Sequence, residues 1–159
     1  MRLGLLAASI GAVFGVLTSP VASQTSRATL STNRVYRGPI KFPDFTGRDQ
    51  AFARFKTRIV KEMASGPNFA GHYAIIEMGC GTSCRSVLMA DVATGRVYDF
   101  PYGGEAYYGL WLTYTVKDNT VRTQWESDDK CIKDDLLWTG SDFRSSNRRI
   151  AGGREACDL

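Results

Sequence analysis

The chain has 159 residues, of which 20 are Lys or Arg and 16 are Asp or Glu, so its formal net charge is only +4. A nucleic-acid-binding surface usually carries a denser cluster of basic residues, and we therefore expect no nucleic-acid partner. The length suits a single domain that is large enough to bury a core of its own.

The first 23 residues have the pattern of a signal peptide. Arg2 gives a positively charged start, residues 3–17 are apolar or small, and residues 21–23 are the small residues that a signal peptidase reads. The apolar stretch is shorter than the roughly 20 residues that a membrane helix needs. The sequence therefore predicts a periplasmic or secreted protein without a stable membrane span after cleavage. An uncleaved N-terminal anchor is the alternative, because such anchors begin in the same way.

Two segments of different character follow the signal peptide. Residues 24–43 are rich in Ser, Thr and Arg and have few apolar positions, which predicts a flexible leader. From Thr46 to Ala64, apolar residues recur at three- and four-residue spacing, a pattern typical of an amphipathic helix. Thr46 followed by Asp49 resembles a capping arrangement, and the sequence Ser-Gly-Pro at 65–67 ends the helix.

Short apolar runs after this helix predict strands. They lie at 73–78, 87–92, 97–100, 109–116, 120–126 and, more weakly, 132–138. No apolar segment of helix length separates them, so the sheet should be antiparallel. We expect residues 44–159 to form a single α+β domain, in which one antiparallel sheet carries the N-terminal amphipathic helix on one face.

The four cysteines all lie beyond the signal peptide. An even number of cysteines in an exported chain predicts two disulfides, and three pairings are possible. We favour Cys80 with Cys84, which flank a glycine-containing turn, and Cys131 with Cys157, which lie in two late segments. The first bridge would stiffen the tip of a hairpin, and the second would join distant parts of the chain.

The segment between Cys80 and Cys84 has two other interpretations. A thioredoxin-like redox centre needs C-x-x-C at the start of a helix, whereas the spacing here is C-x-x-x-C between predicted strands. A zinc site would have only these two thiols and His72, and would lack a fourth ligand. We therefore expect no metal or other cofactor, and a structural disulfide that presents a binding loop. The candidate binding residues in it are Gly81, Thr82 and Ser83.

A second candidate surface is the stretch 102–111, which mixes glycine with aromatic residues. Such loops supply rigid contact area at protein interfaces, and the rings are equally suited to stack against sugars. The other interpretation is that half of these rings fill the core beneath the loop. The candidate binding residues in this stretch are Tyr102, Tyr107, Tyr108 and Trp111.

His72, the one histidine of the chain, is the candidate catalytic residue if the protein is an enzyme. A general base needs a nucleophile or a water molecule within reach, and often a carboxylate that orients it. Glu77 falls on the opposite face of the predicted strand, because successive side chains alternate. The chain has no G-x-S-x-G, H-E-x-x-H or phosphate-loop motif. A structural histidine is therefore the favoured interpretation.

Three motifs carry a resemblance to known proteins: N-F-A-G-x-Y at 68–73, G-C-G-x-x-C at 79–84 and D-x-x-T-G-x-V-Y at 91–98. Together they look like the core of a group of small exported bacterial proteins without an assigned activity. The order of elements is more distantly similar to that of the periplasmic inhibitors of vertebrate lysozyme, which insert a disulfide-tied loop into the cleft of their target. In that family the loop is C-x-x-x-x-C and contains a histidine, whereas the loop here is one residue shorter and has none. The resemblance therefore implies a different target or none.

These patterns favour an exported binding module, with an enzyme inhibitor as its more specific form. The expected partner is a protein of the bacterial envelope or a foreign protein, with a glycan as a further candidate. Two alternatives stay open: a small envelope hydrolase that uses His72, and a structural envelope protein without a ligand. The sequence does not indicate an oligomeric state.

Overall fold

A computed structural model describes residues 34–157 of the chain. The predicted signal peptide and residues 24–33 of the predicted leader lie outside the described residues. The elements in chain order are η1 (Gln50–Phe55, a 3₁₀ helix), α1 (Lys56–Ala64), β1 (Tyr73–Gly81), β2 (Cys84–Asp91), β3 (Val97–Asp99), β4 (Tyr108–Thr113), β5 (Thr120–Ser127), β6 (Lys130–Trp138), β7 (Phe143–Ser145), β8 (Arg149–Gly153) and η2 (Arg154–Cys157).

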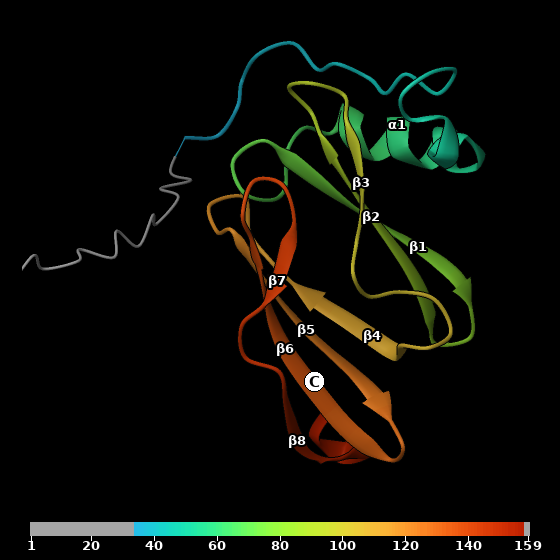
Figure 1. Cartoon of the computed structure of the whole chain (residues 1–159), viewed down its shortest axis with the longest axis vertical. Helices are drawn as coiled ribbons and strands as arrows, with labels where there is room; N and C mark the ends of the chain where they lie inside the picture. Colours follow the sequence, from blue (N-terminus) through green and yellow to red (C-terminus); the bar gives the residue numbers. More distant parts are fainter. Residues whose placement is uncertain (1–33, 158–159) are drawn as a thin grey trace, which may run out of the picture.

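These elements form three layers, in which a helix and a second sheet cover opposite faces of a first sheet (Figure 1). The first sheet has the strand order β1-β2-β3, and the second has the order β4-β5-β6-β7, with β8 also paired to β6. All the strand pairs are antiparallel. The predicted α+β class is therefore confirmed, but the prediction of one sheet is wrong, because the strands divide into two.

The division into two sheets has a signal in the sequence of β1. The residues from Tyr73 to Ile76 form an unbroken apolar run and are all buried. Such a run is typical of a strand that is covered on both faces, whereas a half-exposed sheet gives alternation. Ile75 and Met89 face the second sheet, and Ile76 and Ala90 face the helix. The first sheet is thus the middle layer and cannot leave a face open to solvent.

The helical segment ends at Ala64, as predicted, but it begins differently. It starts as the 3₁₀ turn η1 and becomes α-helical only at Lys56. The predicted capping role of Thr46 is wrong, because the carboxylate of Asp44 accepts the backbone N–H groups of Thr46 and Gly47 at 3.1 and 3.0 Å. The Asp49 carboxylate instead accepts the N–H of Val97 at 3.1 Å, which ties the helical layer to β3.

Residues 34–43 form no helix or strand, yet they contact the body of the protein. The N–H of Tyr36 donates to the carbonyl of Gly71 at 2.8 Å, and that of Lys41 donates to Val92 at 3.0 Å. Gly95 lies against this segment with a φ of +78°, and a Cβ there would fall 2.5 Å from the carbonyl oxygen of Phe42. The T-G motif before β3 therefore marks a turn that needs glycine both for its backbone conformation and for space.

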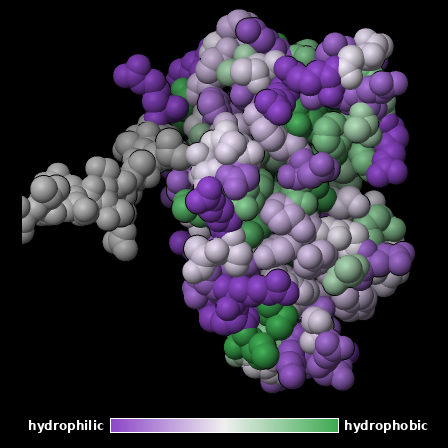
Figure 2. Space-filling model, viewed as in Figure 1, coloured by the Kyte–Doolittle hydropathy of each residue, from purple (hydrophilic) through white to green (hydrophobic). Residues whose placement is uncertain are grey.

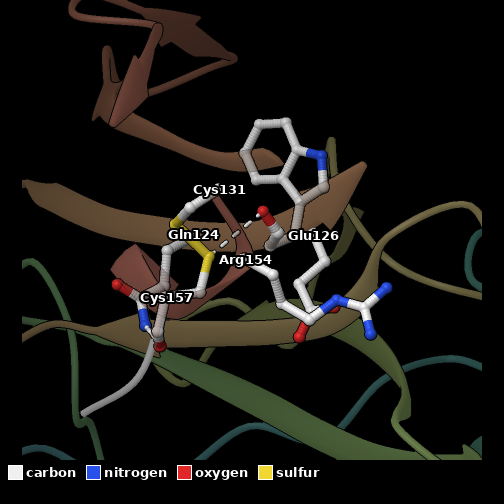
Figure 3. Close-up of a disulfide and its surroundings, with 6 residues drawn as sticks. Gln124, Glu126, Cys131, Arg154 and Cys157 are labelled. Atoms are coloured by element: carbon white, nitrogen blue, oxygen red, sulfur yellow. Dashed lines mark hydrogen bonds and ion pairs between the residues drawn. A yellow bond between two sulfur atoms is a disulfide. The ribbon is translucent and has the colours of Figure 1, made fainter. Parts of the chain in front are cut away.

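The strands β7 and β8 were not anticipated from the sequence, and the second disulfide lies beside β8. Both predicted disulfides are confirmed, with Cα–Cα distances of 5.1 Å for Cys80–Cys84 and 5.3 Å for Cys131–Cys157. The second bridge fastens η2 against the second sheet, where Gln124 Nε2 donates to the carbonyl of Cys157 at 2.7 Å (Figure 3). Arg154 of η2 pairs with Glu126 of β5 at 2.9 Å.

The surface is mixed rather than dominated by one residue type. Figure 2 shows hydrophilic residues over much of this view, together with a compact hydrophobic group at the end formed by β8 and η2. Within residues 34–157, no helix is both long enough and apolar enough to cross a membrane.

Candidate functional site: the hairpin tip and its cleft

The Cys80–Cys84 bridge closes the tip of the hairpin formed by β1 and β2. The strands are joined by a tight turn at Thr82 and Ser83, and Ser83 has a φ of +54°. Residues 79–83 are all exposed. Gly79 pairs with Arg85, and Gly81 pairs with Cys84. The strand register shifts by one residue between these two pairs, so a bulge lies within the bridged segment. A short bridge and a bulge thus hold an exposed tip in one shape.

The hairpin tip lies against the second stretch that the sequence singled out, residues 102–111. The N–H of Gly109 donates to the carbonyl of Ser83 at 2.9 Å, and the N–H of Gly104 donates to the carbonyl of Arg85 at the same distance. The loop between β3 and β4 therefore braces the tip (Figure 1). The two candidate surfaces are one continuous surface, which the sequence had not indicated.

The four aromatic candidates divide equally between core and surface. Tyr102 is 6% exposed, and its hydroxyl donates to the Asp134 carboxylate at 2.5 Å. Tyr107 is half-buried and packs edge-on against Trp125, with ring centroids 5.3 Å apart. Tyr108 and Trp111 are 48% and 42% exposed. Tyr102 and Tyr107 hold the loop in place, and only Tyr108 and Trp111 can offer a large face to a partner.

A cleft of about 520 Å³ opens between the hairpin tip and β4. Arg85 forms an ion pair with Glu77 on its floor and lies over the ring of Trp111, with the guanidinium carbon 5.2 Å from the ring centroid. The Tyr114 hydroxyl donates to the other oxygen of Glu77 at 2.9 Å. Burial and the nearby Glu77 charge both raise the pKa of Tyr114, so this hydroxyl stays protonated at neutral pH. The cleft is thus a polar and firmly positioned surface.

Sequence reasoning missed Glu77 and Arg85 as partners because of the bulge. A two-residue turn without a bulge would pair Glu77 with Leu88, and would place Arg85 on the opposite face of the hairpin. The observed register pairs Glu77 with Val87, so both charged side chains point toward β4. The glycines at 79 and 81 were the available signal, since glycine in a strand often marks a bulge.

His72 lies away from this cleft, just before β1. It lines a separate hollow of about 640 Å³, whose other residues include Arg34, Arg37 and Lys117. Its ring packs edge-on against Tyr73, with centroids 4.2 Å apart. Among the described residues, no carboxylate or hydroxyl forms a hydrogen bond with the imidazole. Glu77 is held by Arg85 and Tyr114 and cannot serve as its orienting carboxylate.

Comparison of the chain with protein-family models, with curated protein sequences and with solved structures found no match in any of the three. In the part of the chain that the structure describes, no group of three or more His, Cys, Asp or Glu residues is arranged to hold a metal ion. The resemblance noted from the three sequence motifs therefore remains a prediction. The two disulfides are compatible with an extracellular or periplasmic location.

Proposed function

We propose that the protein is an exported binding module that presents its Cys80–Cys84 hairpin tip to a protein of the bacterial envelope or to a foreign protein. The observation that carries this proposal is the exposed tip, which is bridged by a disulfide and hydrogen-bonded through Ser83 to Gly109. A loop that already has its bound shape loses little conformational entropy on binding. Affinity can then come from a small contact area.

The residues around the tip have the composition of an interface centre. Tyr108 and Trp111 expose large rings beside it, and Arg85 is fixed against Trp111 by the ion pair with Glu77. Tryptophan, tyrosine and arginine are the residue types that most often dominate binding energy at protein interfaces. The tip supplies a rigid wedge, and the rings supply apolar contact area at its base.

The more specific form of the proposal is an inhibitor whose tip enters the cleft of a target enzyme. A narrow two-residue turn that ends a two-stranded hairpin is a suitable shape for insertion into a concave site. Thr82 and Ser83 would then be the first residues inside the cleft, and Arg85 and Trp111 would contact its rim. Export through the predicted signal peptide at residues 1–23 would place the module in the periplasm or outside the cell.

A substitution at the tip tests the proposal. The oxidised protein, immobilised through its C-terminus, is incubated with an envelope fraction, and retained proteins are identified by mass spectrometry. Thr82→Glu changes an exposed turn residue and should remove the partner by charge and size. Lys61→Glu is the matched control, because it also introduces a glutamate at an exposed position, on α1.

The proposal predicts a protein that the wild type and Lys61→Glu retain and that Thr82→Glu loses. Retention by Thr82→Glu at the wild-type level would exclude the tip as the binding surface. Circular dichroism and the melting temperature of each variant verify that the fold is intact, so that a loss of retention reports on binding.

A further inference from the structure

We infer that a basin on the outer face of the second sheet binds an acidic glycan, a sugar chain that carries carboxylate groups. The basin has a volume of about 210 Å³ and lies on the face of β4, β5, β6 and β8 that points away from the core. Its lining shares Trp111 with the cleft at the hairpin tip and is otherwise made of different residues, so the inference does not depend on what the tip binds. Its main lining residues are Trp111, Arg122, Gln124, Lys133, Asp135 and Arg149.

Strand register places four of these residues in one row. Trp111 pairs with Gln124, Gln124 with Lys133, and Lys133 with Arg149. Neighbouring strands are about 4.8 Å apart, so the row extends over about 14 Å. A single small anion would occupy only part of that length. The row suits an elongated ligand that crosses the strands, such as a short run of linked sugars.

The charges in the basin are unbalanced. Arg122 and Lys133 have no ion pair with any described residue, and the contact of Arg149 is a hydrogen bond from Nη1 to the carbonyl of Asn147 at 3.1 Å. Asp135 is the one acidic residue in the lining. By contrast, Arg154 on the neighbouring η2 contacts the carboxylates of both Glu126 and Asp129.

The position of two of the cations is unfavourable without a ligand. Lys133 and Arg149 are directly opposite each other on adjacent strands. Like charges at such positions destabilise a sheet, and an anion between them would reverse the effect. A carboxylate matches the planar fork of an arginine and shares its charge over two oxygens. These two residues are therefore the proposed anchor for the acidic group.

The remaining lining residues favour a sugar over an acidic peptide. Trp111 lines both the basin and the cleft at the hairpin tip, so its indole forms the wall between them. An exposed ring offers a flat apolar face on which the C–H face of a sugar can stack. Gln124 donates through Nε2 to Cys157, which leaves its carbonyl oxygen to accept a sugar hydroxyl. Across the strands, the row thus offers an aromatic face at Trp111, then a neutral acceptor at Gln124, and then the cations Lys133 and Arg149.

Calorimetric titration with three probes tests this assignment. Tetragalacturonate carries both sugar rings and carboxylates, its methyl ester carries the rings without the charge, and tetraglutamate carries the charge without the rings. We expect the oxidised protein to bind tetragalacturonate at least about tenfold more tightly than either control. Binding that is no tighter for tetragalacturonate than for tetraglutamate would overturn the inference in favour of an acidic peptide, and no binding of tetragalacturonate would overturn it outright.

Substitutions of Lys133 and Arg149 test whether these two residues anchor the acidic group. Lys133→Gln with Arg149→Gln should weaken tetragalacturonate binding by about tenfold or more. The control Lys130→Gln removes a charge from the same strand, at an exposed position outside the basin lining. It should change the affinity for tetragalacturonate by less than about twofold. An equal loss in Lys130→Gln would show a diffuse charge effect and would contradict a defined site. Thr82→Glu should bind the glycan normally, which separates this inference from the proposed function.

Tryptophan fluorescence gives a second readout that does not rely on affinity alone. The chain has three tryptophans, and Trp125 and Trp138 are both 2% exposed, whereas Trp111 is 42% exposed. Quenching by acrylamide therefore reports mainly on Trp111. Saturating tetragalacturonate should protect this ring from quenching, and unchanged quenching would contradict the stacking contact.

Discussion

The two disulfides of this protein differ in what they join. Cys131–Cys157 closes a separation of 26 residues, and Cys131 is fully buried between the second sheet and η2 (Figure 3). Cys80–Cys84 closes a separation of four residues at an exposed tip that the strands β1 and β2 already bring together. A long loop loses more entropy when it is closed than a short one. The Cys131–Cys157 bridge therefore stabilises the fold, and the Cys80–Cys84 bridge chiefly fixes the shape of a surface.

Removal of the long bridge should have the largest effect on stability. For Cys131→Ser with Cys157→Ser, chain entropy predicts a loss of about 3.5 kcal/mol in the free energy of unfolding. Urea denaturation of oxidised protein measures this loss. A loss below about 1 kcal/mol would show that η2 is held mainly by Gln124 and Arg154 rather than by the bridge.

The next largest effect on stability is expected from the contact that anchors the loop 102–111. Tyr102→Phe removes the hydroxyl that donates to Asp134, whose side chain is almost fully buried. A hydrogen bond to a charged group contributes about 1.5–3 kcal/mol, so the free energy of unfolding should fall by about that amount even though Asp134 keeps its bond from the N–H of Asn147. Tyr108→Phe, at an exposed position in the same segment, is the control and should change it by less than about 0.5 kcal/mol. Equal effects would mean that the loop is not anchored through Tyr102.

Removal of the short bridge should separate stability from binding. Cys80→Ser with Cys84→Ser is expected to lower the free energy of unfolding by about 2 kcal/mol or less, because the closed loop is short. Retention of the protein partner should nevertheless fall strongly, since the tip regains conformational freedom. Full retention together with a small loss of stability would show that the bridge is not needed for the surface, and would remove the distinction between the two disulfides.

The stability of the fold should decline at both extremes of pH. Burial alone would raise the pKa of the Asp134 carboxyl, but hydrogen bonds from Tyr102, Ser145 and the backbone outweigh it and hold this pKa below its usual value. In the unfolded chain this carboxyl has its ordinary pKa of about 4, so it takes up a proton more readily there than in the folded protein. Stability is therefore lost as the pH falls below about 4. Burial, with the Asp134 charge as a second cause, raises the pKa of Tyr102 to about 12. The unfolded chain ionises first, so stability is also lost as the pH rises from about 10 to 12.

Melting temperatures measured across this pH range test these directions. Tyr102→Phe lacks the ionisable hydroxyl, so its decline above pH 10 should be smaller than that of the wild type. An equally steep alkaline decline in the variant would show that other groups carry it. Between about pH 5 and 9 both proteins should have nearly constant melting temperatures.

The smallest expected effect concerns the basin. Lys133→Gln relieves the like-charge contact with Arg149 across the strands, so the ligand-free protein should gain about 0.3 kcal/mol in its free energy of unfolding. Arg122→Gln is the comparison, because Arg122 lies opposite the acidic Asp135 in the strand register and its removal should not stabilise the sheet. A loss of stability in Lys133→Gln would contradict the electrostatic argument for an anionic ligand.

Sequence reasoning worked where local pattern controls structure. The helix end, most strands and both disulfides follow from spacing, apolar runs and turn residues. It failed where partners are distant in the chain: the bulge at Gly79–Gly81 decides which face of the hairpin carries Arg85, and β8 is held by pairing with β6 rather than by its own apolar residues. The joining of the tip to the 102–111 loop rests on two backbone hydrogen bonds, which no side-chain pattern encodes.

The most direct test of the account uses photo-cross-linking from the surface itself. A photoreactive amino acid replaces Thr82, Tyr108 or Lys61 in the full-length protein, and adducts formed in intact cells are identified by mass spectrometry. We expect the same protein adduct from positions 82 and 108, because both lie on one surface, and no such adduct from position 61 on α1. Different adducts from 82 and 108, or an equal yield from position 61, would contradict it.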